Sequence, residues 1–474
     1  MLFNSLDFLI FFPIVCVLFF GFPTKYRWLL LLVASCYFYM YFIPIYILIL
    51  AGTIVVDYFA GILIENNHGK KRRFYLILSL LANILVLAVF KYYNFFIENI
   101  EVLLAAMGSK SNLPYLSILL PVGLSFHTFQ AMSYTIEVYR GNQKAEKHFG
   151  IYALYVMFFP QLVAGPIERP QNVLHQFHEH KIFTSENFVK GLKLIIWGFF
   201  MKVVVADRLA LYVNAAYNNV DNHNGSTLLL ATVFFSFQIY CDFAGYSSIA
   251  IGTAKIMGFD LMTNFNRPYF AKTISEFWKR WHISLSTWFR DYLYLPLGGN
   301  KVTKYRWYFN LFIVFLISGI WHGANWTFVI WGALNGGYLV VAIVTQKFRN
   351  QCNDAVGLSK NKTFFTAFQI ITTFILSSFA WIFFRANNVQ DAFLIVEKIG
   401  TALSTDLFVK WDVFFGVFIG LSVLILKEFR DEFLVNKLSF LKKANVSVLF
   451  YALIVALILL MGVFDEGQFI YFQF

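Results

Sequence analysis

Long apolar segments dominate this sequence and recur from its first residues to its last. A helix that crosses a bilayer needs about 20 mostly apolar residues, and many segments come close to that length. The candidate spans are residues 6–22, 27–42, 44–64, 74–96, 114–138, 188–206, 226–250, 308–322, 325–346, 363–384, 411–427 and 446–464. This pattern predicts an all-α polytopic membrane protein with about 11–12 transmembrane helices.

The composition excludes a soluble protein. Hydrophobic residues make up 59% of the 474 residues and charged residues only 14%, whereas soluble domains carry about 25% charged residues. The formal net charge of +12 is spread over loops between the apolar segments, as expected for the cytoplasmic loops of a membrane protein. No basic domain stands apart, so a nucleic-acid partner is not expected.

The alternation of basic and charge-poor loops orients the predicted spans. Basic residues gather at 25–27, 70–73, 140–147, 255–306, 347–362 and 427–443. If these loops face the cytoplasm, the spans alternate in direction without contradiction and both termini lie outside.

Two regions depart from this pattern. The apolar run 150–166 is interrupted by prolines and glycine, so we expect a re-entrant or interfacial segment that protein shields from lipid. Residues 251–306 are too charged to span a membrane, yet they are rich in aromatic residues. From Ile274 to Leu293 the apolar residues recur at helical spacing, which predicts amphipathic or re-entrant helices at the cytoplasmic face.

No metal site is expected. The four cysteines, at positions 16, 36, 241 and 352, lack the paired spacing of metal ligands. The histidines at 175, 178 and 180 are close together, but no further ligand nearby completes a coordination shell.

His322 is the first candidate for chemistry. It lies in the sequence SGIWHGANW (318–326), at the outer end of one predicted span. Ionisable groups at membrane depth usually face a bundle interior or a wet cavity, and Gly319 and Gly323 leave one helix face bare for close approach. A histidine that only packs against its neighbours is the alternative, but an unperturbed pKa of about 6.5 suits proton transfer.

Two further polar residues lie in apolar surroundings. His282, in FWKRWHISLS (277–286), faces inward if the amphipathic insert dips toward the core; a hydrogen-bonded core histidine is the alternative. Asp242, in YCDFAGYS (240–247), lies inside a span and needs a partner or water. It is either paired structurally or lines the reaction cavity. A covalent intermediate on this chain is not supported, because the chain has no Gly-x-Ser-x-Gly motif.

Several of these stretches resemble the membrane-bound O-acyltransferase family, and within it the branch that O-acetylates alginate. A related branch D-alanylates teichoic acids. The matching stretches keep the family's order over nearly the whole chain: PVGLSFHTFQ (121–130), FFPQLVAGPIERP (158–170), YCDFAGYSSIAIG (240–252), NFNRPYF (264–270), SEFWKRWHISLSTWFRDYLYLPLGGN (275–300), SGIWHGANWTFVIWG (318–332) and FIYFQF (469–474).

The resemblance implies a single membrane domain over residues 1–474, in which a ring of helices surrounds a central tunnel. It also implies that His322 is the catalytic histidine of the W-H-G motif and that His282 is the second functional histidine.

The resemblance further implies an acyl, here acetyl, transfer in the bacterial cytoplasmic (inner) membrane. The donor would be a cytoplasmic thioester, either acetyl-coenzyme A or an acyl carrier protein, with no bound cofactor. The final acceptor would be an extracytoplasmic polysaccharide, reached through a periplasmic SGNH-type acetyltransferase as partner, and membrane lipid would surround the chain.

The physical logic of such a reaction assigns roles to other residues. His322 would act as general base on a hydroxyl and then as acid to the leaving thiol. Asn325 and the amides around Gly323 are candidates to stabilise the oxyanion. Basic residues of the insert are candidates to bind the phosphates of the donor: Lys279, Arg280, Lys301 and Lys304. The excess of basic residues in cytoplasmic loops of membrane proteins is the alternative explanation of these charges.

Two other classes of function use the same features. A transporter or flippase for a lipid-linked saccharide would use the cavity without acyl chemistry, and a non-catalytic scaffold of a polysaccharide export complex would need no reactive histidine.

Overall fold

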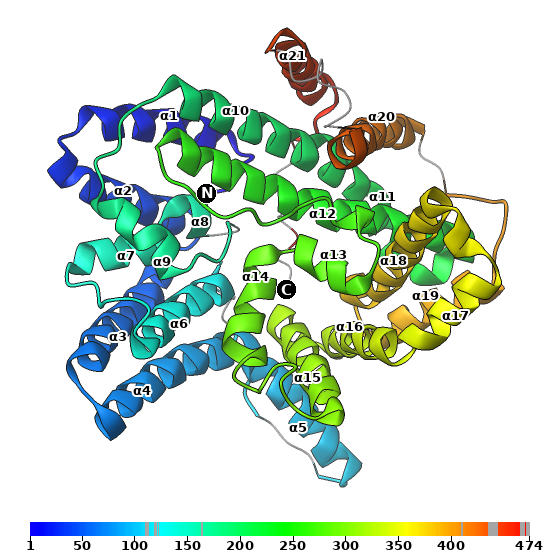
Figure 1. The fold of residues 1–474 in the computed structure, drawn as a ribbon, viewed down its shortest axis with the longest axis horizontal. Helices are drawn as coiled ribbons and strands as arrows, with labels where there is room; N and C mark the ends of the chain where they lie inside the picture. The colour runs from blue at the N-terminus through cyan, green and yellow to red at the C-terminus, as the bar shows by residue number, and fades with distance from the viewer. Residues whose placement is uncertain are drawn as a thin grey trace. The chain divides into compact units, whose positions relative to one another are not determined.

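The computed structural model describes residues 1–109, 113–117, 121, 123–162, 165–408, 411–434, 444–464 and 470. All regular secondary structure in these ranges is helical, which confirms the prediction of an all-α protein (Figure 1). Part of the 114–138 candidate span and all of the 469–474 motif except Ile470 lie outside the described residues.

The chain divides into two compact units, each built from separate stretches of sequence. The first comprises Met1–Ile195 and Tyr246–Met262, and the second comprises Ile196–Gly245 and Thr263–Phe474. Helices α10 and α12 each contribute residues to both units. The single-domain organisation therefore stays a prediction.

The first unit begins with the N-terminal helices. Its helices, with the two shared ones included, are α1 Leu6–Gly21, α2 Thr24–Met40, η1 Pro44–Tyr46, α3 Ile47–Asn66, α4 Gly69–Leu87, η2 Ala88–Tyr92, α5 Tyr93–Ala106, α6 Leu124–Arg140, α7 Phe149–Met157, α8 Phe159–Leu162, α9 Pro170–Val173, η3 Leu174–His178, α10 Ser185–Phe199 and α12 Gly225–Ile256.

The second unit holds the candidate catalytic residues. Besides parts of α10 and α12, it contains η4 Phe200–Ala206, α11 Asp207–Tyr217, η5 Val220–Asn222, η6 Pro268–Phe270, α13 Ile274–Arg280, α14 Ile283–Phe289, η7 Arg290–Tyr294, α15 Lys304–His322, α16 Trp326–Val344, α17 Gln346–Ala355, η8 Leu358–Lys360, α18 Lys362–Arg385, α19 Val389–Thr401, α20 Trp411–Phe429, η9 Arg430–Leu434 and α21 Ala444–Met461.

Helices occur in every predicted span, but they differ in length and polarity. Among the described residues, five are long and apolar enough to cross a membrane: Pro44–Asn66, Gly69–Ala106, Gly225–Ile256, Trp326–Val344 and Lys362–Arg385. The other candidates form helices that are shorter or more charged. Helix α2 has 17 residues, and α15 starts with Lys304 and Arg306. The number of spans and their orientation stay predictions.

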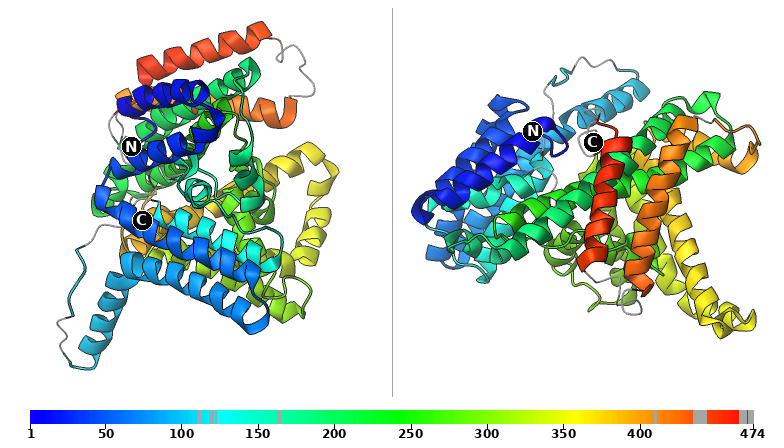
Figure 2. Two further views of the ribbon diagram at one scale, coloured as in Figure 1. Left: turned by 90° about the vertical axis from the view of Figure 1, so that its left-hand side faces the viewer. Right: turned by 90° about the horizontal axis from the view of Figure 1, so that it is seen from above.

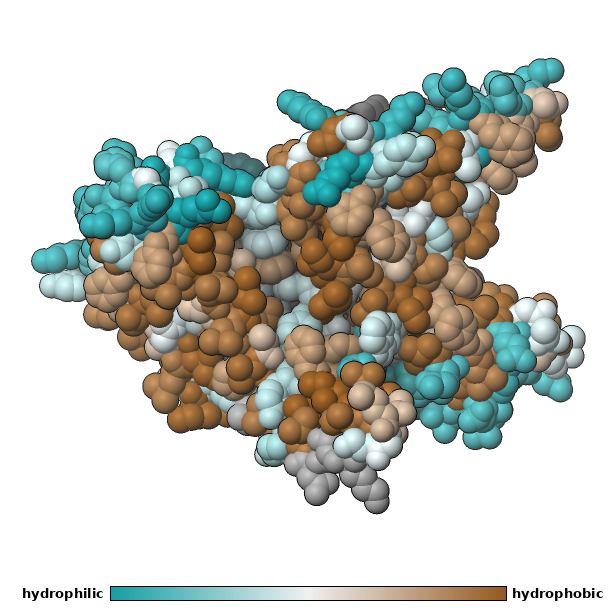
Figure 3. All heavy atoms as spheres, turned by 90° about the horizontal axis from the view of Figure 1, so that it is seen from below, coloured by the Kyte–Doolittle hydropathy of each residue, from teal (hydrophilic) through white to brown (hydrophobic). Residues whose placement is uncertain are grey.

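The surface of the helices suits a lipid environment. Figure 3 shows hydrophobic side chains over much of one face, with hydrophilic side chains gathered toward its edges. Many large apolar side chains in the predicted spans are exposed, Leu48, Leu85 and Leu460 among them. Exposure of so many apolar side chains is unfavourable in water but not in the hydrocarbon core of a bilayer.

Helices α4, η2 and α5 form one continuous helical stretch. Only Ile97 is buried among the residues of α5, and Figure 2 shows α5 extending away from the other helices of the first unit. The sequence predicted a span that ends at residue 96, so the helix continues ten residues further, to Ala106.

The two irregular regions form short helices, as expected, whereas their places at the membrane stay predictions. Within 150–166 the helix breaks at Phe158, and every described residue of α7 from Gly150 to Met157 is buried, so protein shields this segment. The insert forms the short helices α13 and α14, followed by η7. It starts later than predicted, because α12 continues past residue 250 to Ile256.

Helices α15 and α16 pack as a tight antiparallel pair, visible side by side in Figure 1. A Cβ atom at Gly319 would lie 2.3 Å from the carbonyl oxygen of Phe328 and 3.1 Å from the Cα atom of Gly332. A Cβ atom at Gly332 would lie 2.5 Å from the carbonyl oxygen of Phe315. The two backbones are therefore in direct contact, as the bare helix face in the sequence predicted.

We expect Gly319→Ala to destabilise the protein by about 1–3 kcal/mol, because the added methyl group must separate α15 from α16. Thermal unfolding in detergent micelles measures this. Gly337→Ala is the matched control on α16, since no atom lies within 4 Å of a Cβ at that position. Equal unfolding temperatures for the two variants would contradict the close contact.

Candidate active site

His322 is the last residue of α15, and its side chain is buried. Among the described residues, three aromatic rings meet its imidazole edge to face. The ring centroids of Trp331 and Trp321 each lie 5.0 Å away, and that of Phe384 lies 5.3 Å away. The described surroundings of the imidazole are therefore largely aromatic. This geometry is compatible with both the packing and the catalytic interpretations of His322.

An aromatic cluster connects this imidazole to the insert that contains α13 and α14. Trp331 of α16 stacks on Trp381 of α18 at 5.8 Å, and Trp381 contacts Trp281 at 4.9 Å. Trp278 of α13 meets Trp331 edge to face at 5.6 Å. The structure thus joins the W-H-G motif to the R-W-H motif through indole rings, although no direct contact between the two imidazoles is seen among the described residues.

His282 lies at the junction of α13 and α14 and is 1% exposed. Its backbone adopts the left-handed conformation, with φ +43°, which is uncommon for a residue other than glycine. Its Nδ1 lies 3.1 Å from Oδ1 of Asn264, and its ring meets Phe243 edge to face at 4.5 Å. Burial lowers the pKa of His282 to about 3, so the imidazole is neutral near pH 7.

The four basic candidates of the insert fall into different environments. Arg280 is held in ion pairs with Glu276 at 2.7 Å and Glu432 at 2.9 Å. Burial alone would raise the pKa of Glu432, but hydrogen bonds from Arg280 and Arg267 hold it below its usual value. Arg280 therefore has a structural role in this structure.

The remaining three candidates are exposed. Lys279 lines a cavity of about 1500 Å³ that α13 to α18 enclose. Lys301 and Lys304 are also exposed but do not line that cavity. Of the four predicted donor-binding residues, the structure therefore places Lys279 at this cavity and the other three outside its lining.

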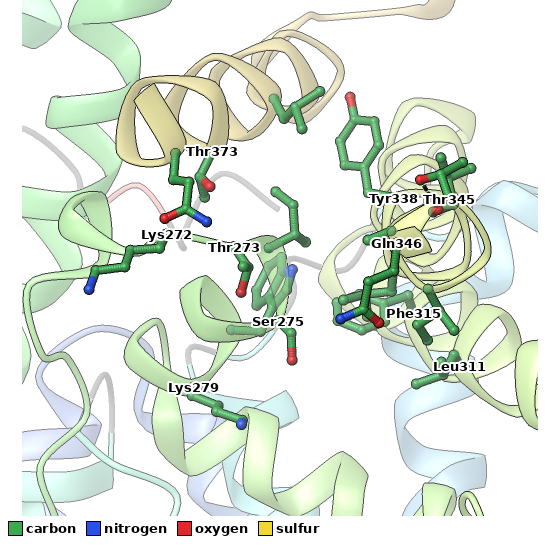
Figure 4. A pocket seen from close by; sticks show the side chains of 18 of the residues that line it. Lys272, Thr273, Ser275, Lys279, Leu311, Phe315, Tyr338, Thr345, Gln346 and Thr373 are labelled. Atoms are coloured by element: carbon green, nitrogen blue, oxygen red, sulfur yellow. Dashed lines mark hydrogen bonds between the residues drawn. The ribbon is translucent and has the colours of Figure 1, made fainter. Parts of the chain in front are cut away.

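This cavity is apolar with a basic edge. Figure 4 shows Ser275 and Lys279 of α13, Leu311 and Phe315 of α15, and Thr373 of α18 around it; the ammonium group of Lys272 turns outward at its edge. None of the described residues that line it is acidic. His322 is not among the lining residues, but Ser318, one turn earlier in α15, and Trp278 are.

Asp242 is paired in the structure. Its Oδ1 lies 2.6 Å from Nζ of Lys202, which also lies 2.7 Å from Oδ1 of Asp207. Its Oδ2 accepts a hydrogen bond from the backbone amide of Ile470 at 2.7 Å. Of the two alternatives for Asp242, these contacts favour the structural one.

Asn325 caps α16. Its side-chain oxygen accepts from the amide of Thr327 at 2.9 Å, and its side-chain nitrogen donates to the carbonyl oxygen of Asn387 at 3.4 Å. A capping side chain of this kind satisfies the first turn of a helix. The contacts of Asn325 do not point toward His322.

The sequence analysis did not identify Lys202, Asn264 or the indole rings around His322. Lys202 could have been found, because it is a charge inside the apolar run 188–206 and such a charge needs a partner. Nothing in the sequence assigned a role to Asn264, or to the indoles that surround His322. No group of three or more metal-ligating side chains occurs in the described ranges.

Lys202→Met is expected to lower the free energy of unfolding by about 3–5 kcal/mol, because it leaves two buried carboxylates facing each other. Unfolding in detergent micelles by heat or denaturant measures the change. Lys190→Met, on the exposed side chain that pairs with Glu186, is the control and is expected to have little effect. An unfolding transition of Lys202→Met equal to that of the control would contradict a structural role for this ion pair.

Comparison with known proteins places these motifs in a family. Residues 148–384 match the model of the membrane-bound O-acyltransferase family. A Pseudomonas aeruginosa protein named "Probable alginate O-acetylase AlgI" is 38% identical, over 84% of this chain and 74% of the relative.

Relatives with other names match as well. A Helicobacter pylori peptidoglycan O-acetyltransferase is 36% identical, over 78% of this chain and 72% of the relative. A Bacillus subtilis teichoic acid D-alanyltransferase is 28% identical, over 56% of this chain and 69% of the relative. Both the family match and the extent of similarity to the first relative lead to one conclusion: the chain belongs to the membrane-bound O-acyltransferase family of integral membrane acyltransferases.

Proposed function

We propose that this protein moves an acetyl group from a cytoplasmic thioester, across the membrane, for O-acetylation of an extracytoplasmic polysaccharide. The observation that carries the proposal is His322, buried among aromatic rings at the end of α15 in a chain of this family. Two of its relatives bear names that refer to O-acetylation of alginate or peptidoglycan, which supports a polysaccharide acceptor.

The cavity beside α13 suits the entry of the donor. Coenzyme A and the prosthetic group of an acyl carrier protein both carry phosphate, and Lys279 offers a positive charge at an apolar cavity without acidic lining. The inner wall contains Trp278, which contacts Trp331, and Trp331 contacts His322. Two indole rings in contact, those of Trp278 and Trp331, thus connect the wall of the cavity to the imidazole, and we infer that the acyl group reaches His322 past them.

The proposed reaction at His322 transfers the acyl group from the sulfur of the thioester to the oxygen of a hydroxyl group. The imidazole takes the proton of the acceptor hydroxyl while the oxygen attacks the thioester carbonyl. The carbon–sulfur bond then breaks, and the imidazolium returns the proton to the leaving thiolate. One histidine serves as base and then as acid, and such acid–base help is worth about 10²–10⁴-fold in rate.

The oxyanion of this reaction needs a hydrogen-bond donor. The side chain of Asn325 already caps α16. The indole Nε1–H of Trp331 is buried and has no acceptor among the described residues, and its ring lies against His322. A buried donor without a partner is costly, and a developing oxyanion would satisfy it. We therefore assign this role to Trp331 rather than to Asn325.

The acceptor side follows from the impermeability of the bilayer to coenzyme A. Only the acyl group has to cross, and an extracytoplasmic enzyme has no activated acyl groups of its own. We infer that a periplasmic SGNH-type acetyltransferase receives the acetyl group and completes transfer to the polysaccharide. The bacterial cytoplasmic membrane is the location that this arrangement requires.

His322→Ala is expected to reduce acetyl incorporation into polysaccharide by about 10²-fold or more, with the amounts of membrane protein and exported polysaccharide unchanged. Labelled acetate released from the polysaccharide by mild base measures it. His175→Ala, at an exposed histidine, is the control. Loss of export in His322→Ala would favour a flippase or a scaffold, and full acetylation would contradict a catalytic His322.

A charge reversal at the cavity tests the donor site. Lys272→Glu with Lys279→Glu is expected to raise the KM for the donor about tenfold or more, because two attractions for phosphate become repulsions, while kcat changes little. The matched control is Lys301→Glu with Lys304→Glu, which changes the net charge equally outside the cavity. Similar KM values for the two double variants, measured with acetyl-coenzyme A and with acetylated carrier protein, would count against this cavity as the donor site.

A further inference from the structure

The contacts of His282 identify the tautomer of its imidazole. Oδ1 of Asn264 lies 3.1 Å from Nδ1 of His282. The same oxygen accepts from the backbone amide of Ser284 at 3.2 Å and from the hydroxyl of Ser284 at 2.9 Å. A backbone amide can only donate, so the atom of Asn264 that faces it is the oxygen and not the nitrogen.

An amide oxygen can only accept, so Nδ1 of His282 must donate to it. The proton of a neutral imidazole therefore lies on Nδ1, and Nε2 carries the lone pair. This is the tautomer in which Nε2 can accept a proton or a hydrogen bond from a substrate.

The backbone holds both residues in register. The amide of Ile283 donates to the carbonyl oxygen of Asn264 at 2.8 Å, and the amide of Asn266 donates to the carbonyl oxygen of Arg280 at 2.9 Å. These bonds do not involve the side chain of Asn264. A substitution of that side chain can therefore change the imidazole while the two segments stay paired.

We propose that Asn264 is a positioning residue that fixes His282 as the Nδ1-protonated tautomer and so leaves Nε2 as its proton acceptor. The proposal rests on the proposed function of this site, because it gives His282 a part in acyl transfer. Asn264 does not touch the reacting atoms in this role; it acts through His282.

The neighbours of His282 that the structure describes here are uncharged. Phe243 of α12 and Phe265 lie against its ring, and Asn264 and Ser284 are its hydrogen-bonding neighbours. None of these side chains titrates near neutral pH, and burial is the cause of its low pKa. A carboxylate at position 264 would place a negative charge directly beside the ring and would raise its pKa.

The experiment is nitrogen NMR of protein labelled with 15N-histidine, in detergent micelles near pH 7. The His282 signals are assigned by their loss in His282→Asn, since asparagine tolerates the left-handed backbone of this position. We expect a protonated Nδ1 and an unprotonated Nε2 in the unsubstituted protein. In Asn264→Ala the Nε2-protonated tautomer should appear, and in Asn264→Asp the pKa of His282 should rise by at least about one unit.

Ser284→Ala is the matched control for the NMR signal. It removes the hydroxyl but keeps the backbone amide that orients Asn264, so Nδ1 should stay protonated. In acyl transfer, Asn264→Ala should lower kcat about tenfold or more and leave the KM for the donor unchanged, since acid–base help is worth about 10²–10⁴-fold. Asn264→Asp should add an ionisation to the pH dependence of kcat.

A protonated Nε2 in the unsubstituted protein, or an unchanged tautomer in Asn264→Ala, would overturn the proposal. So would a kcat of Asn264→Ala equal to that of the unsubstituted protein, when its NMR spectrum shows the altered tautomer. The NMR signals do not depend on acyl transfer. Failure of the proposed function would appear separately, as acetylation that persists in His322→Ala.

Discussion

The direct backbone contact of α15 and α16 is the constraint on which the rest of this site depends. In hydrocarbon, apolar side chains gain little by meeting each other, so helices associate through close packing of small residues. A Cβ at Gly319, Gly332 or Gly336 would lie 2.3–3.0 Å from a backbone atom of the facing helix. His322 is three residues beyond Gly319, on the same helix. The contact therefore sets where its imidazole meets Trp331, and hence the distance from the cavity beside α13 to the imidazole nitrogens.

The ion pairs in apolar surroundings distinguish charged residues with a structural role from residues that could act in binding or catalysis. Lys202 is held by Asp207 and Asp242, and Arg280 by Glu276 and Glu432. Leaving any of these charges without a partner would be strongly unfavourable, so they are committed to the fold. Lys279 differs because it lies at a cavity that has no acidic lining among the described residues. His282 differs because it is buried in its neutral form, with an amide rather than a carboxylate beside it.

Much of the fold could be predicted from the sequence, because apolar runs, charges and glycines report on lipid exposure and close packing directly. The break in 150–166, the short helices of the insert and the small-residue contact at Gly319 all followed from local pattern. The ends of the helices were harder to predict: α12 reaches Ile256 and α5 reaches Ala106, beyond the residues where hydropathy placed the ends of these spans. Partners distant in sequence could not be predicted at all. The ion pair of Arg280 with Glu432, the hydrogen bond of Asn325 to Asn387 and the hydrogen bond of Asn264 to His282 depend on how distant segments fold onto one another.

The central claim is that only the acyl group crosses from a thiol on one side to a hydroxyl on the other. Proteoliposomes with the protein in one orientation test it directly. They enclose a thioester donor with labelled acetyl and labelled thiol, and the periplasmic partner with polysaccharide is supplied outside. The account predicts that acetyl label appears on the external hydroxyls while the thiol label stays inside. Thiol label outside the vesicles, or equal transfer when the donor is supplied on the same side as the polysaccharide, would contradict it.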